Sequence, residues 1–174
     1  MTMPKVLIVT GPGGAGKTTI AQMVAERCGS IYLDADSEDT EFFPDGGQWL
    51  PENSEKLKKA HEKILNKTSE LIEKGHSVVV DYIIFGRYAE FFDMFRSRFG
   101  SGLLIKVLFP TEAVTVKRDK ERDCWTTGEE RIKAVSGELW DVKEIVGKEN
   151  FIDTSNQSSE ETFNKYFSNC FKAP

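Results

Sequence analysis

The stretch GPGGAGKTT, residues 11–19, is the feature that most limits what this chain can fold into. It matches the spacing G-x-x-x-x-G-K-T in full, it follows the apolar run VLIV after one threonine, and it directly precedes the helix-like run IAQMV. Glycines at such positions let consecutive backbone N–H groups converge on one anion, and the start of the following helix adds partial positive charge. The stretch therefore predicts a phosphate-binding loop between a strand and a helix.

The residues of this loop also indicate which ligand it binds. We expect Lys17 to reach the β- and γ-phosphates of a nucleoside triphosphate and the Thr18 hydroxyl to bind Mg²⁺. A glycine-rich turn that only joins a strand to a helix needs neither the lysine nor the fixed spacing, so triphosphate binding is favoured. The expected nucleotide-binding residues of the loop are Gly11, Pro12, Gly13, Gly14, Ala15, Gly16, Lys17, Thr18 and Thr19.

Short apolar runs rich in β-branched residues recur along the chain, with helical patterns between them. The runs lie at 6–9, 31–33, 78–80, 103–109 and 151–152, and the helical patterns at about 53–75, 88–99, 111–123 and 129–146. This alternation predicts an α/β fold with a parallel sheet and crossover helices. The turn-rich CWTTGE between the last two helical patterns is a candidate mobile loop.

Length and composition narrow the function classes. A chain of 174 residues suits one domain, 1–174, and its formal charge of −5 gives no general attraction to nucleic acid. The three cysteines show no C-x-x-C spacing, which favours free thiols in a reducing compartment. The apolar stretch near the N-terminus is too short for a signal peptide or a membrane span, so we expect a cytoplasmic protein without a membrane partner.

Two short motifs help to separate the classes of nucleotide-binding protein, namely guanine-binding switches, hydrolytic motors and kinases. A guanine-binding switch would carry N/T-K-x-D, and the nearest sequence, VKRD, lacks the first residue and lies in a helical pattern. A hydrolytic motor would end a strand with Asp-Glu, whereas VVV here ends in Asp81-Tyr82. Asp81 offers a carboxylate to Mg²⁺ or the acceptor, with loop capping as the alternative. Without a glutamate to activate water, transfer to a bound alcohol is favoured over hydrolysis.

The second apolar run leads into YLDADSE, which places Asp34 and Asp36 at the carboxyl end of a strand. In an open α/β sheet this edge is the ligand crevice. One carboxylate there could accept the proton of an attacking hydroxyl while the other holds a Mg²⁺-bound water. The alternative is a solvated acidic loop and helix cap; next to a phosphate-binding loop, the functional interpretation is favoured.

Arginines and aromatic residues give further candidates. Arg118 and Arg122 share a helix face and could neutralise charge on a moving phosphoryl group, although exposed helices also carry such mixed charge. Arg87 follows the third run beside a glycine and is expected to contact the acceptor. Phe42, Phe43 and Trp49 suggest an aromatic wall of the acceptor site or a packed cap. His61 and His76 lack metal-ligand spacing, so both are expected to be structural.

Taken in order, GPGGAGKTT, LDADSE, VVVDYIIF, KRDKERD and FIDTS resemble the small P-loop kinases related to shikimate, gluconate and chloramphenicol kinases. The resemblance runs from residue 6 to about 155. It implies a three-layer P-loop NTPase fold, a parallel sheet of about five strands in the order 2-3-1-4-5 with helices on both faces, and ATP and Mg²⁺ as cofactors. It also implies an acceptor-binding segment at about 37–60 and a lid at about 118–131.

Matched by position, the resemblance gives Asp36 the task of orienting or deprotonating the acceptor hydroxyl and places Asp34 near the metal waters. Arg118 and Arg122 correspond to lid arginines, one of which lies against adenine in relatives. Thr154 and Ser155 correspond to the loop that borders the adenine. Shikimate kinases carry a glycine-rich segment at the third strand where this chain has DYII, so shikimate is not the expected acceptor.

These interpretations converge on an ATP- and Mg²⁺-dependent kinase that phosphorylates a hydroxyl of a small molecule. A nucleoside or nucleotide kinase is the nearest alternative, because the same scaffold serves both. A nucleotide-binding sensor that has lost transfer is an alternative of another class. A polynucleotide kinase is disfavoured by the acidic charge and the lack of a basic stripe. The sequence specifies neither the acceptor nor the oligomeric state.

Overall fold

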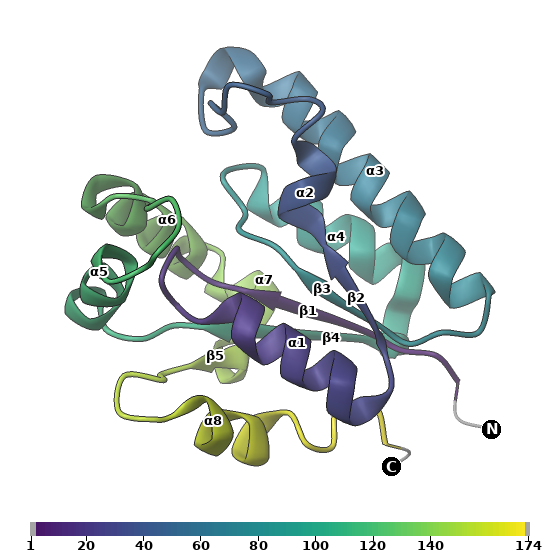
Figure 1. Cartoon of the computed structure of the whole chain (residues 1–174). Coiled ribbons are helices and arrows are strands. Elements are labelled where there is room, and N and C mark those ends of the chain that lie inside the picture. Colours follow the sequence, from purple (N-terminus) through teal and green to yellow (C-terminus); the bar gives the residue numbers. More distant parts are fainter. Residues whose placement is uncertain (1–2, 173–174) are drawn as a thin grey trace.

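The computed structural model describes residues 3–172, and its strands form one parallel sheet in the order β2-β3-β1-β4-β5 (Figure 1). This is the strand order that the resemblance implies. The central strands are buried on both faces, which is why they are continuous apolar runs and not alternating ones. The strands are β1 (Val6–Thr10), β2 (Ile31–Asp34), β3 (Val78–Asp81), β4 (Leu103–Leu108) and β5 (Phe151–Ile152).

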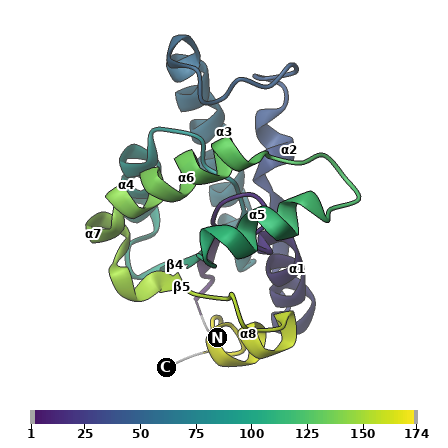
Figure 2. The same ribbon diagram turned by 90° about the vertical axis from the view of Figure 1, so that its left-hand side faces the viewer.

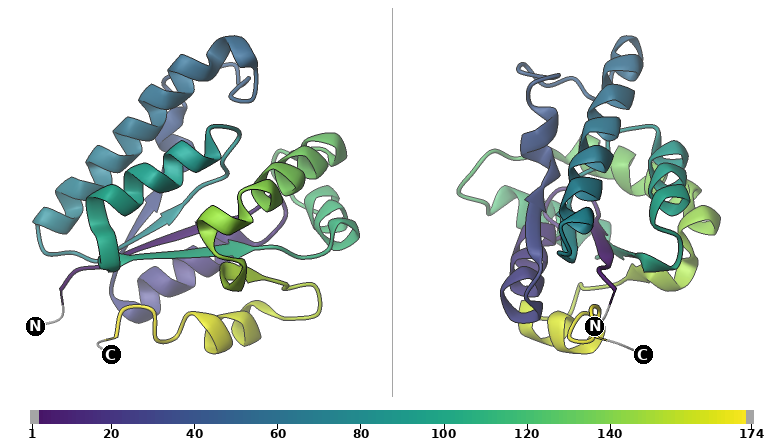
Figure 3. Two further views of the ribbon diagram at one scale, coloured as in Figure 1. Left: turned by 180° about the vertical axis from the view of Figure 1, so that it is seen from behind. Right: turned by 90° about the vertical axis from the view of Figure 1, so that its right-hand side faces the viewer.

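Helices cover both faces of this sheet and make a three-layer fold. One face carries α3, α4 and α7, and α3 and α4 lie side by side in the view from behind (Figure 3, left). The other face carries α1 and α8. The helices are α1 (Lys17–Cys28), α2 (Ala35–Asp39), α3 (Ser54–Glu73), α4 (Tyr88–Phe99), α5 (Glu112–Lys120), α6 (Glu129–Asp141), α7 (Lys143–Val146) and α8 (Ser159–Tyr166).

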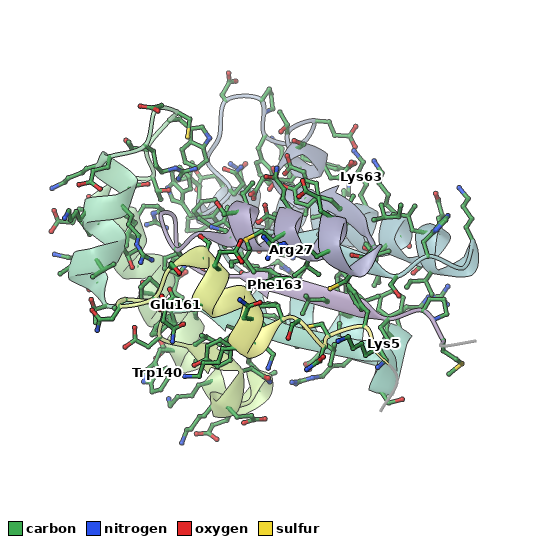
Figure 4. The ribbon with its side chains drawn as sticks, turned by 60° about the horizontal axis from the view of Figure 1, so that its bottom comes forward. Lys5, Arg27, Lys63, Trp140, Glu161 and Phe163 are labelled. Atoms are coloured by element: carbon green, nitrogen blue, oxygen red, sulfur yellow. The ribbon has the colours of Figure 1, made fainter. Side chains whose placement is uncertain are left out.

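Alternate residues of each strand supply the two cores. Ile8 of β1 faces the layer of α3 and α4, whereas its neighbour Leu7 faces α1 and α8, because successive strand side chains point to opposite faces. On the α1 side, the Arg27 guanidinium lies 4.9 Å from the centre of the Phe163 ring, and the two side chains are neighbours in Figure 4. The sheet is therefore held between two separate apolar layers.

The predicted bounds of two helices are wrong. The helix expected at 111–123 ends at Lys120, because the Asp119 carboxylate bonds to the backbone of the following loop and not along the helix. The helix expected at 129–146 is two helices, α6 and α7. At Val142 the N–H bonds to the carbonyls of Leu139 and Trp140, and the resulting turn lets Val146 reach the core, where it is buried.

Within residues 3–172, no helix combines the length and the apolar character that a bilayer span requires.

The aromatic row on α4 is expected to contribute strongly to stability. Phe95 is fully buried and its ring centre lies 4.8 Å from that of Phe91. Phe95→Ala is expected to lower the free energy of unfolding by about 3–5 kcal/mol, because it leaves a cavity in the core. Phe99→Ala, at the partly buried end of the same helix, is the control and should cost less in urea denaturation. Equal losses for the two variants would contradict this account of the core.

Candidate active site

The phosphate-binding loop joins β1 to α1 at the carboxyl edge of the sheet (Figure 1). Gly14 and Gly16 have φ values of 81° and 91°, which glycine adopts most readily. A Cβ atom on Gly14 would lie 2.6 Å from the carbonyl oxygen of Thr115, so no larger residue fits. Gly16 places no side chain over the first turn of α1. The backbone N–H groups of this turn therefore face the site, as an anion-binding helix start requires.

Lys17 is already folded over this loop. Its Nζ donates to the carbonyl oxygen of Pro12 at 3.1 Å, and the side chain is buried. Burial lowers the pKa of Lys17, although the nearby Asp36 and Asp81 carboxylates act in the opposite direction. We call the space above the loop the phosphate cavity; its volume is about 260 Å³. It is lined by Gly14, Gly16, Lys17, Thr18, Thr19, Arg118 and Arg122, so the structure brings both predicted arginines to the loop.

Asp81 closes the floor of the site at the end of β3. It is almost fully buried, and its Oδ2 accepts hydrogen bonds from the Thr18 hydroxyl at 2.7 Å and the Tyr32 hydroxyl at 2.9 Å. Its Oδ1 is buried and, among the described residues, has no hydrogen-bond partner. A hydroxyl beside a carboxylate with a spare oxygen is the donor set that suits Mg²⁺ and its bound waters. The residues present thus fit the expected metal, and Tyr32 is a member of the site that the sequence did not indicate.

The DADSED stretch forms the short helix α2, not a solvated loop. Asp34 caps this helix: its carboxylate accepts the Ser37 N–H at 3.1 Å and the Ser37 hydroxyl at 2.7 Å. The helix turns Asp36 inward, where its Oδ1 accepts the N–H of Ile83 at 3.1 Å. The expected helix cap is therefore found at Asp34, while Asp36 lies in the site.

Asp39, one turn further along α2, is a buried carboxylate that the sequence does not indicate. Its Oδ2 accepts the Tyr82 hydroxyl at 3.0 Å. Burial raises the pKa of Asp39 to about 6, although the Tyr82 hydrogen bond acts against this rise. Burial likewise raises the pKa of Asp36 to about 7; Lys17 opposes the rise and Asp81 adds to it. A carboxyl group with a pKa near neutrality can exchange a proton under ordinary conditions.

These carboxylates line a second space, which we call the acidic cavity; its volume is about 380 Å³. It shares Thr18 and Arg122 with the phosphate cavity, so the two spaces meet at these side chains. The lining residues are Thr18, Tyr32, Asp34, Asp36, Ser37, Asp39, Thr40, Gln48, Ile83, Phe85, Arg122 and Trp125.

A third space, which we call the β5 cavity, adjoins the other side of the phosphate cavity; its volume is about 260 Å³. Arg118 lines both and donates to the carbonyl oxygen of Thr154 at 3.1 Å. Thr154, which the resemblance predicts to border the adenine, lines this cavity. Ser155 does not: its hydroxyl accepts the N–H of Thr111 at 2.8 Å and holds the loop in place. The lining residues are Ala15, Gly16, Ile20, Leu108, Arg118, Thr154, Gln157, Ser158, Ser159 and Thr162.

Arg87 lies outside all three cavities. It begins α4 in the left-handed conformation with φ 51°, donates to the Ser54 hydroxyl at 2.8 Å and pairs with Glu90. Arg87 therefore ties the start of α3 to the start of α4 in this structure.

The aromatic residues of segment 37–60 take two different places. Phe43 is buried against Leu57 and Ala60, which is the packed cap that the sequence left open. Trp49 is 43% exposed and packs edge-on against Phe85, with ring centres 5.5 Å apart. Phe85 lines the acidic cavity directly, so Trp49 stands one layer behind it. His61 is buried between Tyr82 and Phe91, and burial lowers its pKa to about 3, in keeping with a structural role.

The loop at 121–128, which we call the lid loop, is fastened by Asp119. The Asp119 carboxylate is nearly inaccessible and accepts the N–H groups of Thr127 at 2.9 Å and Gly128 at 3.0 Å. Burial alone would raise the pKa of Asp119, but these bonds and Arg122 hold it below its usual value. A Cβ atom on Gly13 would lie 1.9 Å from the Thr127 hydroxyl oxygen. The lid loop thus rests directly on the phosphate-binding loop, and α5 and α6 lie over this edge of the sheet (Figure 2).

The fold and these cavities define a P-loop nucleotide-binding protein. Residues 6–140 match the family described as AAA domain, so this chain belongs to that family.

Solved structures share this fold over nearly the whole chain. A gluconokinase from Sinorhizobium meliloti 1021 has a TM-score of 0.66 at 19% identity, covering 98% of this chain and 93% of that one. A shikimate kinase from Acinetobacter baumannii has a TM-score of 0.63 at 18% identity, covering 97% and 93%. The tunicamycin resistance protein of Deinococcus radiodurans has a TM-score of 0.69 at 17% identity, covering 93% and 92%. At these identities the likeness confirms the fold.

Curated sequences match over short segments. A shikimate kinase from Streptomyces avermitilis is 50% identical over 38 residues, which are 22% of this chain and 22% of that one. A polyprotein of Solenopsis invicta virus 3 is 36% identical over 55 residues, which are 31% of this chain and 2% of the polyprotein. The chain thus spans only a small part of the curated relatives that it matches.

Asp36→Asn is expected to stabilise the fold at about pH 8 by roughly 1–3 kcal/mol, with much less effect near pH 4. The pKa of Asp36 rises from 3.8 to about 7 on folding, so its contribution to stability is present below pH 3.8 and is lost as the pH rises toward 7. An asparagine at position 36 cannot ionise, so this loss of stability does not occur, and its side-chain oxygen can still accept the Ile83 N–H. Urea denaturation of both proteins at the two pH values measures the effect. Asp93→Asn, exposed on α4, is the control, and an equal gain at both pH values would refute the buried charge.

Asp119→Asn is expected to loosen the lid loop. An amide can accept one of the two N–H groups but presents its own N–H groups to the other, so one loop bond is lost. Tryptic cleavage after Arg122 should then accelerate by about tenfold, because it requires local opening. Mass spectrometry of timed digests gives the rate. Glu130→Gln, exposed in the first turn of α6 and away from the bond that is cut, is the matched control. If both variants are cut at the parent rate, Asp119 does not hold the loop.

Proposed function

We propose that this protein is an ATP- and Mg²⁺-dependent kinase that transfers a phosphoryl group to a hydroxyl of a small molecule. The observation that carries the proposal is the junction of the phosphate cavity with the acidic cavity at Thr18 and Arg122. The phosphate cavity would hold the phosphate chain of the donor, and the acidic cavity, which Asp36 lines, would hold the acceptor. The fold shared with gluconokinase and shikimate kinase supports this assignment.

On the donor side, the loop N–H groups and Lys17 would hold the β- and γ-phosphates. The β5 cavity opens beside Gly16 and Arg118, so the base and ribose would extend from the phosphate cavity into it. Arg118 is already oriented by the Thr154 carbonyl oxygen and offers a planar guanidinium to the base. Adenine as the base follows from the family resemblance.

The Thr18 hydroxyl and the Asp81 carboxylate would hold Mg²⁺, directly or through its waters. When bound, the ion supplies charge neutralisation between the phosphates and fixes their orientation. Tyr32 contributes by holding the Asp81 carboxylate in place. Asp34 lines the neighbouring cavity and would contact the outer waters, although its oxygens also cap α2.

On the acceptor side, Asp36 would orient the attacking hydroxyl and take its proton. The Ile83 N–H fixes Oδ1 of Asp36, which leaves Oδ2 for the hydroxyl. With a pKa of about 7, the carboxylate is available as a base at neutral pH and above. Phosphoryl transfer depends mainly on positioning and charge neutralisation, so a carboxylate held in this way is sufficient.

Arg122 and the lid loop would complete the site. Arg122 lines both cavities, so its guanidinium can neutralise charge on the phosphoryl group as it moves between them. Its guanidinium carbon lies 5.3 Å from the centre of the Trp125 ring, which keeps the arginine over the cavities. A lid that excludes water favours transfer to the alcohol over hydrolysis.

The direct test is ADP release by the purified protein with Mg²⁺ and ATP, first alone and then with nucleosides, sugars, aminoglycosides, phenicols and polyol acids. Release that depends on an acceptor and exceeds the background establishes a kinase and its acceptor class. Tight ATP binding without release for any acceptor would instead favour a nucleotide-binding sensor.

Asp36→Asn is expected to lower kcat with a confirmed acceptor by about 10²–10⁴-fold, because the hydroxyl loses its base. The affinity for ATP should stay within about threefold of the parent, because the loop residues are untouched. Steady-state ADP release and equilibrium nucleotide titration measure the two quantities. Asp93→Asn is the control for the loss of one surface charge. A variant that works at the parent rate would remove Asp36 from the mechanism.

A further inference from the structure

We propose that the acidic cavity accepts an alcohol that carries no negative charge, either neutral or cationic, and that it presents an aromatic wall to an apolar face of this ligand. Hydroxy acids are thereby excluded as acceptors. The inference rests on the proposed function, because it concerns the ligand that receives the phosphoryl group. It comes from the balance of charges around the cavity.

Three carboxylates at the end of β2 and on α2, which we call the α2 carboxylates, dominate this balance. Asp34, Asp36 and Asp39 all line the cavity, and Asp39 is buried with its carboxylate held by the Tyr82 hydroxyl. These side chains face one space from the last residue of β2 and from the short helix α2. Their separate partners fix each carboxylate in place, so none can turn away when a ligand enters.

Few cations would remain to offset these carboxylates once a triphosphate is bound. Arg122 is the single basic side chain among the residues of 3–172 that line the acidic cavity. Arg122 also lines the phosphate cavity, and so does Lys17. A bound triphosphate would therefore pair with both of these cationic side chains. The Arg87 guanidinium pairs with Glu90 and Ser54 outside the cavity, and that of Arg131 lies 5.1 Å from the ring centre of Trp49.

An anionic acceptor would therefore enter against like charges. It would face the α2 carboxylates and the triphosphate, and it would lose its hydration without gaining a free cation. A neutral polyol could instead hydrogen-bond with the side chains of Ser37, Thr40 and Gln48. An ammonium group would pair with the α2 carboxylates and offset the cost of burying them.

The lining of the acidic cavity also has an apolar and aromatic part. It is formed by Ile83, Phe85 and Trp125, and the Phe85 ring is in edge-on contact with the Trp49 ring. At about 380 Å³ the cavity falls in the lower part of the range for small-molecule sites, so a ligand of one or two rings would fill it. A flat face on such a ligand would pack against these rings.

Three probes test the charge preference on one scaffold: para-hydroxymethyl benzylamine, benzene dimethanol and para-hydroxymethyl benzoate. They share a ring and a primary alcohol and differ in charge. Binding is followed by the indole N–H signal of Trp125 in nitrogen-edited NMR, with Mg²⁺ and a non-hydrolysable ATP analogue present and the signal assigned with Trp125→Phe. We expect the amine and the diol to bind at least about tenfold more tightly than the benzoate. Equal or tighter binding of the benzoate, or no shift with any probe at millimolar concentration, would overturn the proposal.

The variant Asp39→Asn tests whether the Asp39 carboxylate causes the preference for ligands without negative charge. Asn still accepts the Tyr82 hydroxyl but carries no charge, so the ratio of amine to benzoate affinity should fall by about fivefold or more. Asp93→Asn should leave this ratio unchanged, and far-ultraviolet circular dichroism verifies that both variants are folded. An unchanged ratio in folded Asp39→Asn would refute the role of this carboxylate. The same three probes are then tested for ADP release in the presence of ATP. If the amine and the diol bind more tightly than the benzoate but no probe causes ADP release, the result counts against the kinase activity and leaves the charge preference intact.

Discussion

The buried carboxylate of Asp81 is the interaction on which the site depends. It stands at the end of β3 and receives hydroxyl hydrogen bonds from Thr18 at the start of α1 and from Tyr32 on β2. One charged group thus fixes the phosphate-binding loop relative to the neighbouring strand ends. Because charge-assisted hydrogen bonds are directional and strong when buried, the loop is held in position before any ligand arrives. The remaining buried oxygen, Oδ1, is left for the metal shell.

The acidic cavity lowers the stability of the fold at neutral pH and above. Burial raises the pKa values of Asp36 and Asp39, so at neutral pH the folded state disfavours charges that the unfolded chain carries freely. Apolar residues of similar size would be more stable at these positions. Carboxylates that weaken a fold in this way and line a cavity next to a phosphate-binding loop are typical of a functional site. His61 differs, because it is buried neutral among aromatic rings and lines none of the three cavities described.

The fold and the phosphate-binding loop could be predicted from the sequence, but the rest of the candidate site could be predicted only in part. Strand positions followed from apolar runs, and the loop from its fixed spacing, because both are local patterns. Asp39 and Asp119 carry no such signal: each reads as an ordinary helix-surface carboxylate until the tertiary structure buries it. Arg87 shows the converse, because a suggestive position beside a glycine gave it a role in the acceptor site, whereas the structure ties it to Ser54 and Glu90. Contacts between segments far apart in sequence decide such cases.

Lys17 and Asp36 couple the two cavities through their charges. In the free protein the positive field of Lys17 holds the pKa of Asp36 below the value that burial alone would set. A triphosphate on the loop would engage Lys17 and bring its own negative charge, so the same carboxylate would become a stronger base when the donor is bound. Nucleotide binding and proton affinity at Asp36 are then linked, and by thermodynamic reciprocity each favours the other. The carboxylate that faces the acceptor would thereby gain its greatest affinity for the hydroxyl proton when a phosphoryl donor is in place.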